Sequence, residues 1–261
     1  MPLVDRGKYY GGKVYSDIRE AMKREDSVHF CYDVFDAPPV CFDDGGYGDP
    51  TGSAGNENRM ISAMANYFEY HIIGTQSIVC PAWGVNGLNI GMDQTSGDGI
   101  EITQGITARS RGAFTCRTAK KPFLFRVSLS MALPATVTEY AVGFRKAEAY
   151  QVAIDNYDEM ACLNALVGVI NIETIDNGAT TVTTDTTETD WDDAEQHSFT
   201  VKVSPSGVVT FEYDDVAPTV TASLTFDEDE VVIPFLYFKN GGASGEINLK
   251  SWECRYDRTV P

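Results

Sequence analysis

The sequence predicts an all-β protein built as an antiparallel β-sandwich. From about residue 67 onward, short runs of apolar residues alternate with polar ones, as expected for strands that bury one face. Turns rich in Gly, Asp, Thr and Pro separate these runs, and no long helical segment lies between them. Parallel strands need crossover helices, so this pattern favours antiparallel pairing in one sandwich domain, residues 61–261.

Residues 1–60 differ from the rest and are predicted to form an extended N-terminal arm. Its clearest helical segment is Ser16–Asp26, whose apolar face is too narrow to bury a core of its own. The Gly-, Asp- and Ser-rich stretch Asp43–Asn58 is unsuited to a regular element. We therefore expect the arm to order against a partner. The candidate partner contacts are Ile18, Met22, Phe30, Tyr32 and Phe35.

Period-2 alternation predicts the strands of the sandwich. In FLFRVSLSM, for example, Phe125, Val127 and Leu129 share one face. The segment from Met60 to Tyr67 has helical spacing but leads into the strand-like FEYHII, so both assignments stay open there. Strands are expected at 68–73, 123–131, 139–146, 166–174, 198–203, 208–213, 219–226, 231–239 and 246–256.

Two local signals define the strand geometry more closely. The sequence Ser204-Pro205-Ser206-Gly207 between two alternating runs predicts a β-hairpin with Gly207 in the left-handed conformation. In the last strand the inward positions change phase between Leu249 and Trp252, which predicts a β-bulge near Lys250–Ser251.

Composition excludes several classes of function. The chain carries 20 Lys and Arg against 38 Asp and Glu, a formal net charge of −18 without a basic run, which disfavours nucleic acid and anionic membranes as partners. No apolar stretch is long enough to span a bilayer, and the first residues lack a signal peptide, so we expect synthesis in a cytoplasm. The six cysteines form no C-x-x-C pair and are expected to be reduced. No nucleotide-binding motif is present, and no cofactor is expected.

Residues 141–189, followed by HSFTVKVSPSGVVTFEYDDVAP and DEDEVVIPFLYFKN, resemble tailed-bacteriophage virion proteins of the kind common in marine and cyanobacterial phages. The hairpin FTVKVSPSGVVTFEYDD and the closing I-x-L-x-x-W are similar to the concanavalin A-like jelly roll. The resemblance covers roughly residues 120–257. It implies a capsid cement or decoration protein on the virion surface, bound to the major capsid protein and assembled as a dimer or trimer that stabilises the shell.

Concanavalin A-like sandwiches also include lectins, so the alternative function is a fibre or adhesin domain that recognises a host surface glycan. Lectins use exposed aromatic rings beside polar groups. Of the three tryptophans, Trp252 is predicted to lie in the core and Trp83 is a weaker candidate. Trp191, flanked by Asp190 and Asp192, is the best candidate for a ligand contact.

Retaining glucanases with this fold carry the pattern E-x-D-x-x-E, which places two carboxylates across the scissile bond. The comparable stretch here, Glu188 to Asp193, ends in Asp and is predicted to be an exposed loop. We therefore expect no enzymatic activity. Acidic runs at Asp227–Glu230 and Asp43-Asp44 offer oxygen ligands for calcium but are more typical of solvated turns, so no metal site is expected. His29, His71 and His197 are interpreted as structural.

Overall fold

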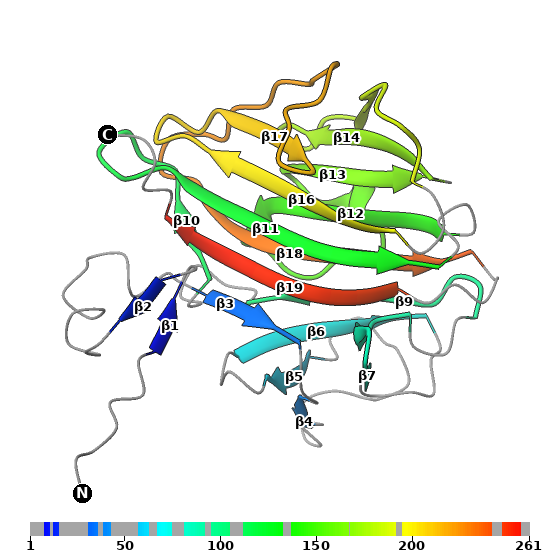
Figure 1. The fold of residues 1–261 in the computed structure, drawn as a ribbon. Helices are drawn as coiled ribbons and strands as arrows, with labels where there is room; N and C mark the ends of the chain where they lie inside the picture. Colours follow the sequence, from blue (N-terminus) through cyan, green and yellow to red (C-terminus); the bar gives the residue numbers. More distant parts are fainter. Residues whose placement is uncertain are drawn as a thin grey trace, which may run out of the picture.

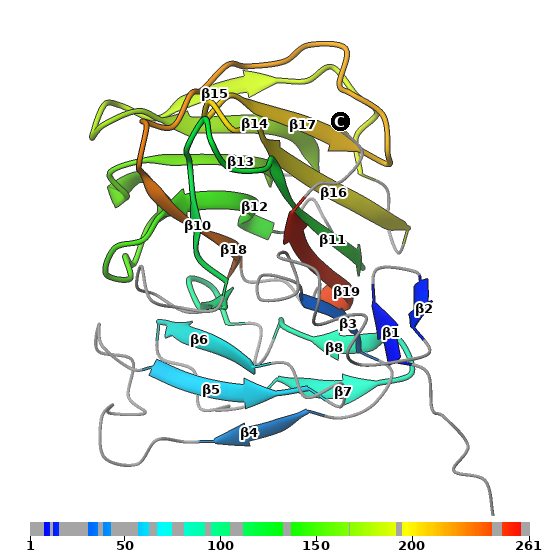
Figure 2. The ribbon, with the colours of Figure 1, turned by 90° about the vertical axis from the view of Figure 1, so that its left-hand side faces the viewer.

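The computed structural model confirms an all-β sandwich of two antiparallel sheets (Figures 1 and 2). It describes residues 8–10, 13–15, 31–35, 39–42, 57–62, 67–74, 81–91, 95–104, 112–132, 137–166, 168–191, 195–241 and 247–256. Among these residues no helix has the length and apolar character needed to cross a bilayer.

The ten-stranded sheet has the order β15-β14-β13-β12-β18-β9-β6-β5-β4, with β10 paired to β18. Its strands are β15 (Val182–Asp185), β14 (Val169–Ile175), β13 (Met160–Leu166), β12 (Val137–Lys146), β18 (Val231–Asn240), β9 (Gly99–Thr103), β6 (Tyr67–Ile73), β5 (Glu57–Ile61), β4 (Val40–Phe42) and β10 (Phe114–Thr115).

The seven-stranded sheet has the order β17-β16-β11-β19-β8-β7, with β3 paired to β19. Its strands are β17 (Val209–Tyr213), β16 (Gln196–Val203), β11 (Phe123–Met131), β19 (Ile247–Tyr256), β8 (Gly87–Asn89), β7 (Ala82–Gly84) and β3 (Cys31–Val34). A separate hairpin joins β1 (Lys8–Tyr10) to β2 (Lys13–Tyr15). One short 3₁₀-helix, η3 (Ile154–Asn156), lies between β12 and β13.

The core between the sheets follows from the alternation in the sequence. Phe125, Val127 and Leu129 of β11 are fully buried, whereas the residues between them are half-buried on the outer face. Trp252 packs against Phe125, with ring centroids 4.4 Å apart, and so lies in the core as predicted. Burying such aromatic side chains stabilises a fold by about 1.5–3 kcal/mol each.

Both predicted local features are present. β16 and β17 form a hairpin in which Gly207 has φ +83°, and its N–H donates to the Ser204 carbonyl at 3.0 Å. The register of β11 against β19 shifts between Ser128 and Leu129, because Lys250 has no partner residue in the ladder. This bulge lets Leu249 and Trp252 both face the core.

One predicted strand is wrong. The segment 219–226 is irregular and makes only an isolated bridge from Thr225 to Val208. Leu224 and Phe226 are buried in alternation with exposed neighbours, which explains the strand-like sequence pattern. The segment lies along the edge of β17, where the Val209 N–H donates to the Leu224 carbonyl at 3.0 Å.

Strands from the predicted arm pair within both sheets. β3 pairs with β19, and β4 pairs with β5. The boundary drawn between residues 60 and 61 falls inside β5, so the helical alternative for Met60 is wrong. β5 also includes Glu57 and Asn58, which were expected to be irregular. The predicted helix Ser16–Asp26 lies outside the described residues.

A second apolar cluster covers the outer face of the ten-stranded sheet. Residues 147–158, including η3, place Ile154 and Tyr157 against Phe235 and Tyr237 of this sheet. The described cysteine side chains Cys116, Cys162 and Cys254 are buried.

Candidate ligand-binding groove

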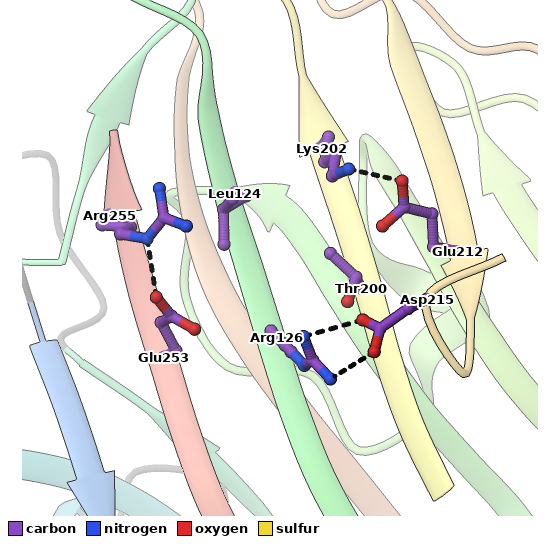
Figure 3. A pocket seen from close by; sticks show the side chains of 8 residues that line it. All are labelled: Leu124, Arg126, Thr200, Lys202, Glu212, Asp215, Glu253 and Arg255. Carbon is purple, nitrogen blue, oxygen red and sulfur yellow. Dashed lines mark hydrogen bonds and ion pairs between the residues drawn. The ribbon is translucent and has the colours of Figure 1, made fainter. Parts of the chain in front are cut away.

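A shallow groove lies on the outer face of the seven-stranded sheet, across β17, β16, β11 and β19 (Figure 3). Its volume is about 200 Å³. Three side chains in it are basic, three are acidic, and the other two are a threonine and a leucine. The lining residues are Leu124, Arg126, Thr200, Lys202, Glu212, Asp215, Glu253 and Arg255.

Strand alternation explains why these side chains face outward. Arg126 lies between the buried residues Phe125 and Val127, and Lys202 lies between Val201 and Val203. The strand register then aligns them in two rows. The first row contains Glu253, Arg126, Thr200 and Glu212, and the second contains Arg255, Leu124 and Lys202.

Three ion pairs lie in the groove. Arg126 holds Asp215 through two parallel contacts, Nη1 to Oδ1 at 2.7 Å and Nη2 to Oδ2 at 3.0 Å. Arg255 Nε lies 2.6 Å from Glu253 Oε1. These pairs fix the orientation of charged donors and acceptors that remain within reach of solvent. The third pair joins Lys202 to Glu212.

Thr200 lies beneath the groove. It is 3 % exposed, and its Oγ1 is buried without a hydrogen-bond partner among the described residues. A buried polar atom without a partner typically costs about 1–3 kcal/mol.

The Asp214–Asp215 turn after β17 has an unusual backbone. Asp214 and Asp215 have φ values of +49° and +66°, although neither is glycine. The Tyr213 and Val216 backbones bond to each other across this two-residue turn, at 2.8 and 3.0 Å. Such conformations cost about 1–3 kcal/mol per residue and concentrate at ligand-binding and active sites. The turn places the Asp215 carboxylate over Arg126.

The groove is suited to binding rather than to proton transfer. A glycosidase needs a carboxyl that holds a proton and a second one beside it. Each of the three groove carboxylates is instead ion-paired with a basic side chain. Within the described ranges, no group of three or more His, Cys, Asp or Glu side chains is placed to hold a metal ion.

Trp191 is buried, contrary to the exposed position that made it the best candidate for a ligand contact. The indole is 4 % exposed and packs against Tyr140 and Phe199, with ring centroids 6.0 and 5.3 Å away. Its Nε1 donates to the Glu195 carbonyl at 3.3 Å. The acidic residues beside Trp191 in the sequence suggested that it is exposed. Its indole has a large apolar surface, however, and burying that surface at the end of the core is more favourable. Asp190 is exposed, and Asp192 lies outside the described residues.

The other tryptophan and glutamate candidates also lie away from the groove. Trp83 is 42 % exposed on the edge strand β7, and its Nε1 donates to the Phe35 carbonyl at 3.2 Å. Glu188 lies in an irregular segment, as predicted, and accepts the Thr219 N–H at 2.7 Å.

Of the proposed arm contacts, only Phe35 has a described side chain. It is 3 % exposed and packs against Phe68 at 5.8 Å between ring centroids, which corrects the expectation that it faces a partner. The Phe35 N–H donates to the Lys250 carbonyl at 3.0 Å, which directs the residue into the core. Tyr32 lies in β3 opposite Glu253. The contacts predicted for Ile18, Met22 and Phe30 fall outside the described residues.

The acidic run at Asp227–Glu230 is engaged with protein groups. Asp229 pairs with Arg117, Glu228 accepts the Thr118 N–H, and Glu230 lies 3.6 Å from Lys146 Nζ. Residues 228–229 form a turn, as predicted. The other acidic run, Asp43-Asp44, lies outside the described residues.

Perturbed titratable groups cluster on the other sheet. Burial lowers the pKa of His71 to about 4, and the charge of Arg145 adds to this effect. Burial, reinforced by Glu230 and Asp227, raises the pKa of Glu159 to about 7. The buried ring of His71 stacks on Tyr150 with centroids 4.3 Å apart, but neither of its nitrogens has a hydrogen-bond partner among the described residues.

No known protein family and no curated protein matches the sequence. The chain is similar to the solved carbohydrate recognition domain of Emp47p, with 10 % identity, a TM-score of 0.49, and coverage of 72 % of this chain and 88 % of that one. It is also similar to lectin II from Ulex europaeus, with 12 % identity, a TM-score of 0.47 and coverage of 84 % and 98 %. A third similar structure is the CBM2 module of the evolved Dit of Lactobacillus casei BL23 phage J-1, with 14 % identity, a TM-score of 0.44 and coverage of 70 % and 80 %.

Proposed function

We propose that this chain is a non-enzymatic carbohydrate-binding protein and that the groove on the seven-stranded sheet is its binding site. The observation that carries the proposal is the lining itself. Three basic and three acidic side chains, joined in ion pairs, line the groove. Sugar hydroxyls donate and accept hydrogen bonds at once, so they complement such paired donors and acceptors.

The charge balance of the groove also indicates the class of ligand. The basic residues Arg126, Lys202 and Arg255 equal in number the acidic residues around them. A strongly anionic or cationic ligand would leave one set facing like charge. A neutral oligosaccharide would meet both sets, and the rigid strands keep the ordering cost of binding small.

Titration with neutral and acidic oligosaccharides, followed by NMR chemical shifts, tests the proposal. We expect neutral sugars to shift the signals of Arg126, Thr200 and Asp215, and Arg126→Ala to weaken binding about tenfold or more, since a charge-assisted pair is lost. Arg117→Ala is the matched control, because Arg117 makes a similar exposed pair with Asp229 outside the groove. Binding that survives Arg126→Ala unchanged would place the site elsewhere.

A second candidate is the structural role in a phage virion, as a capsid cement or decoration protein. The hairpin of β1 and β2 supports it, since this hairpin pairs with no described strand of either sheet and lies outside both (Figure 1). An isolated hairpin is marginal in water. Attachment to a major capsid protein or to a second copy of the chain would stabilise it.

Mass-spectrometric quantification of purified particles tests this second role. A decoration protein is expected at hundreds of copies, in a fixed ratio to the major capsid protein, whereas a fibre or adhesin domain is expected at far fewer. Deleting residues 1–15 should release the protein from particles while the sandwich stays folded. Full occupancy after this deletion would contradict attachment through the hairpin.

A further inference from the structure

The outer face of the seven-stranded sheet continues beyond the groove as a patch of uncharged polar side chains, which we name the polar strip. Strand alternation points these side chains outward from β11, β16 and β19, on the same face as Arg126. This face is turned toward the viewer in Figure 1. The members of the polar strip are Ser128, Ser130, Gln196, Ser198, Asn248 and Ser251.

The strand register arranges the polar strip in two rows that follow directly on the rows of the groove. The first row contains Ser198, Ser128 and Ser251, and the second contains Gln196, Ser130 and Asn248. From Arg126 in the groove to Ser130 in the second row, β11 extends over about 13 Å. This distance exceeds the length of one sugar ring. The groove and the polar strip together therefore offer more than one sugar unit a place on the sheet.

Hydrogen bonds join the polar strip to the groove. Arg126 Nη2 donates to the Ser198 hydroxyl at 3.3 Å, while the same guanidinium holds Asp215. Gln196 Nε2 donates to the Ser128 hydroxyl at 2.8 Å. A ligand seated beside Arg126 would thus reach the first row of the polar strip next.

The polar strip differs from the groove in charge. Six of the eight side chains that line the groove are charged, whereas the polar strip contains only hydroxyls and amides. These groups both donate and accept hydrogen bonds, as sugar hydroxyls do. Asparagine is depleted in β-strands, yet Asn248 lies directly opposite Asn89 of β8. Residues that contradict the preference of their own element are expected at functional sites.

We propose that the polar strip is a second subsite of the carbohydrate site, and that the ligand is a linear neutral oligosaccharide lying along β11. One sugar unit occupies the groove beside Arg126, and the following units lie over Ser128 and Ser130. This inference rests on the proposed function and adds the shape and minimum length of its ligand. A charged sugar over the polar strip would lose hydration without gaining an ion pair, so the units there are uncharged.

Affinity as a function of chain length tests the second subsite. The probes are the mono- to tetrasaccharides of neutral linear glucose, mannose and galactose series, titrated calorimetrically into the full chain. We expect the trisaccharide of one series to bind about tenfold more tightly than its monosaccharide, the size of one or two added hydrogen bonds. Equal affinity at all lengths, with the Arg126 signal still shifted by sugar, would overturn this inference and leave the proposed function standing. Absence of binding by every probe would reject both.

A double variant, Ser128→Val with Ser130→Val, tests the residues of the second subsite. It removes two hydroxyls, and valine suits a strand, so the fold should persist. The readout is the ratio of trisaccharide to monosaccharide affinity, which should fall from about tenfold to about one. Thr210→Val is the matched control, because it removes an exposed hydroxyl from β17 opposite Lys202, on the other side of the groove. The control should keep the natural ratio, and a double variant that also keeps it would overturn the proposal.

A second copy of the chain is the competing occupant of this face. Sedimentation equilibrium without sugar tests it beside the calorimetry. A dimer that the double variant dissociates would show that another copy covers the polar strip, and would overturn the proposal. A natural chain and a double variant with the same oligomeric state would support the polar strip as a surface open to sugar.

Discussion

The outer faces of the two sheets carry the same kinds of charged side chain in opposite surroundings. On the seven-stranded sheet, Arg126 and Asp215 form a pair whose side chains are 37 % and 61 % exposed. On the ten-stranded sheet, Arg145 and Glu101 form a pair in which both side chains are fully buried beneath residues 147–158. On the covered face the charged side chains contribute to the stability of the fold. On the open face they remain available to a ligand.

The buried pair is held by several surrounding groups. Arg145 Nε donates to Glu101 Oε1 at 2.9 Å, and Arg145 Nη2 lies 2.7 Å from the same oxygen. Its NH1 donates to the carbonyls of Lys146 and Glu148, and its guanidinium lies 4.3 Å from the centre of the Tyr157 ring. The Tyr157 hydroxyl donates to the second Glu101 oxygen. The arginine thereby ties the covering segment to the sheet.

The largest expected effect is on this buried pair. Arg145→Met should lower the free energy of unfolding by about 3–5 kcal/mol, because it leaves the Glu101 carboxylate buried without its cation. The double variant Arg145→Met with Glu101→Gln should recover part of the loss. Urea denaturation measures both. A loss below about 1 kcal/mol would mean that water reaches this face as freely as the other.

A smaller loss is expected at the tyrosine that completes the cluster. Tyr157→Phe removes the hydroxyl that donates to Glu101 and should cost about 1–3 kcal/mol, the penalty for an unpartnered buried acceptor. The ring and its contact with Arg145 remain. Thermal unfolding beside the natural chain measures the change, and an unchanged midpoint would show that Glu101 is satisfied without Tyr157.

The pH dependence of stability distinguishes a paired buried carboxyl from an unpaired one. Both oxygens of Glu159 are buried without hydrogen-bond partners, and the pKa of this carboxyl is raised from 4.5 to about 7. Between these values the folded state binds more protons than the unfolded state, so its contribution to stability falls as pH rises. Glu159→Gln should flatten the stability profile between about pH 4.5 and pH 7. A profile with unchanged slope would contradict the burial of this group.

The smallest effect on stability is expected on the open face. Arg126→Ala removes an exposed pair and should change the free energy of unfolding by about 0–1 kcal/mol, even though it is expected to abolish most glycan binding. Paired measurements of stability and binding test this separation. A loss comparable to that of Arg145→Met would mean that the groove supports the fold, and the contrast between the two faces would disappear.

Sequence alternation was sufficient to predict the sandwich, because the pattern within each strand indicates which of its faces is buried. The bulge at Lys250 was predictable for the same reason, since the change of phase lies within a single strand. The groove was not predictable, because Arg126, Thr200 and Glu253 are far apart in the sequence and meet only through the register of three strands. One signal was present in the sequence: Asp214-Asp215 occupies a hairpin turn position where Asn-Gly is usual.

Trp191 shows the opposite failure. Its acidic neighbours in the sequence suggested an exposed residue, whereas its indole packs against Tyr140 of β12 and Phe199 of β16. The polarity of its sequence neighbours predicts whether a residue is exposed only when that residue lies within a regular element. The strand-like pattern of 219–226 misled for a related reason, because Leu224 and Phe226 are buried by lying along the edge of β17 rather than within a ladder.

The buried thiols make opening of the sandwich detectable by chemical modification. Burial raises the pKa of Cys116 to about 12 and that of Cys162 well above its ordinary range, so neither forms the thiolate that alkylating reagents attack. In a chain whose Cys31, Cys41 and Cys80 are replaced by serine, each alkylation event therefore records one opening of the sandwich. Because Cys162 lies in β13, its modification reports the opening of the ten-stranded sheet.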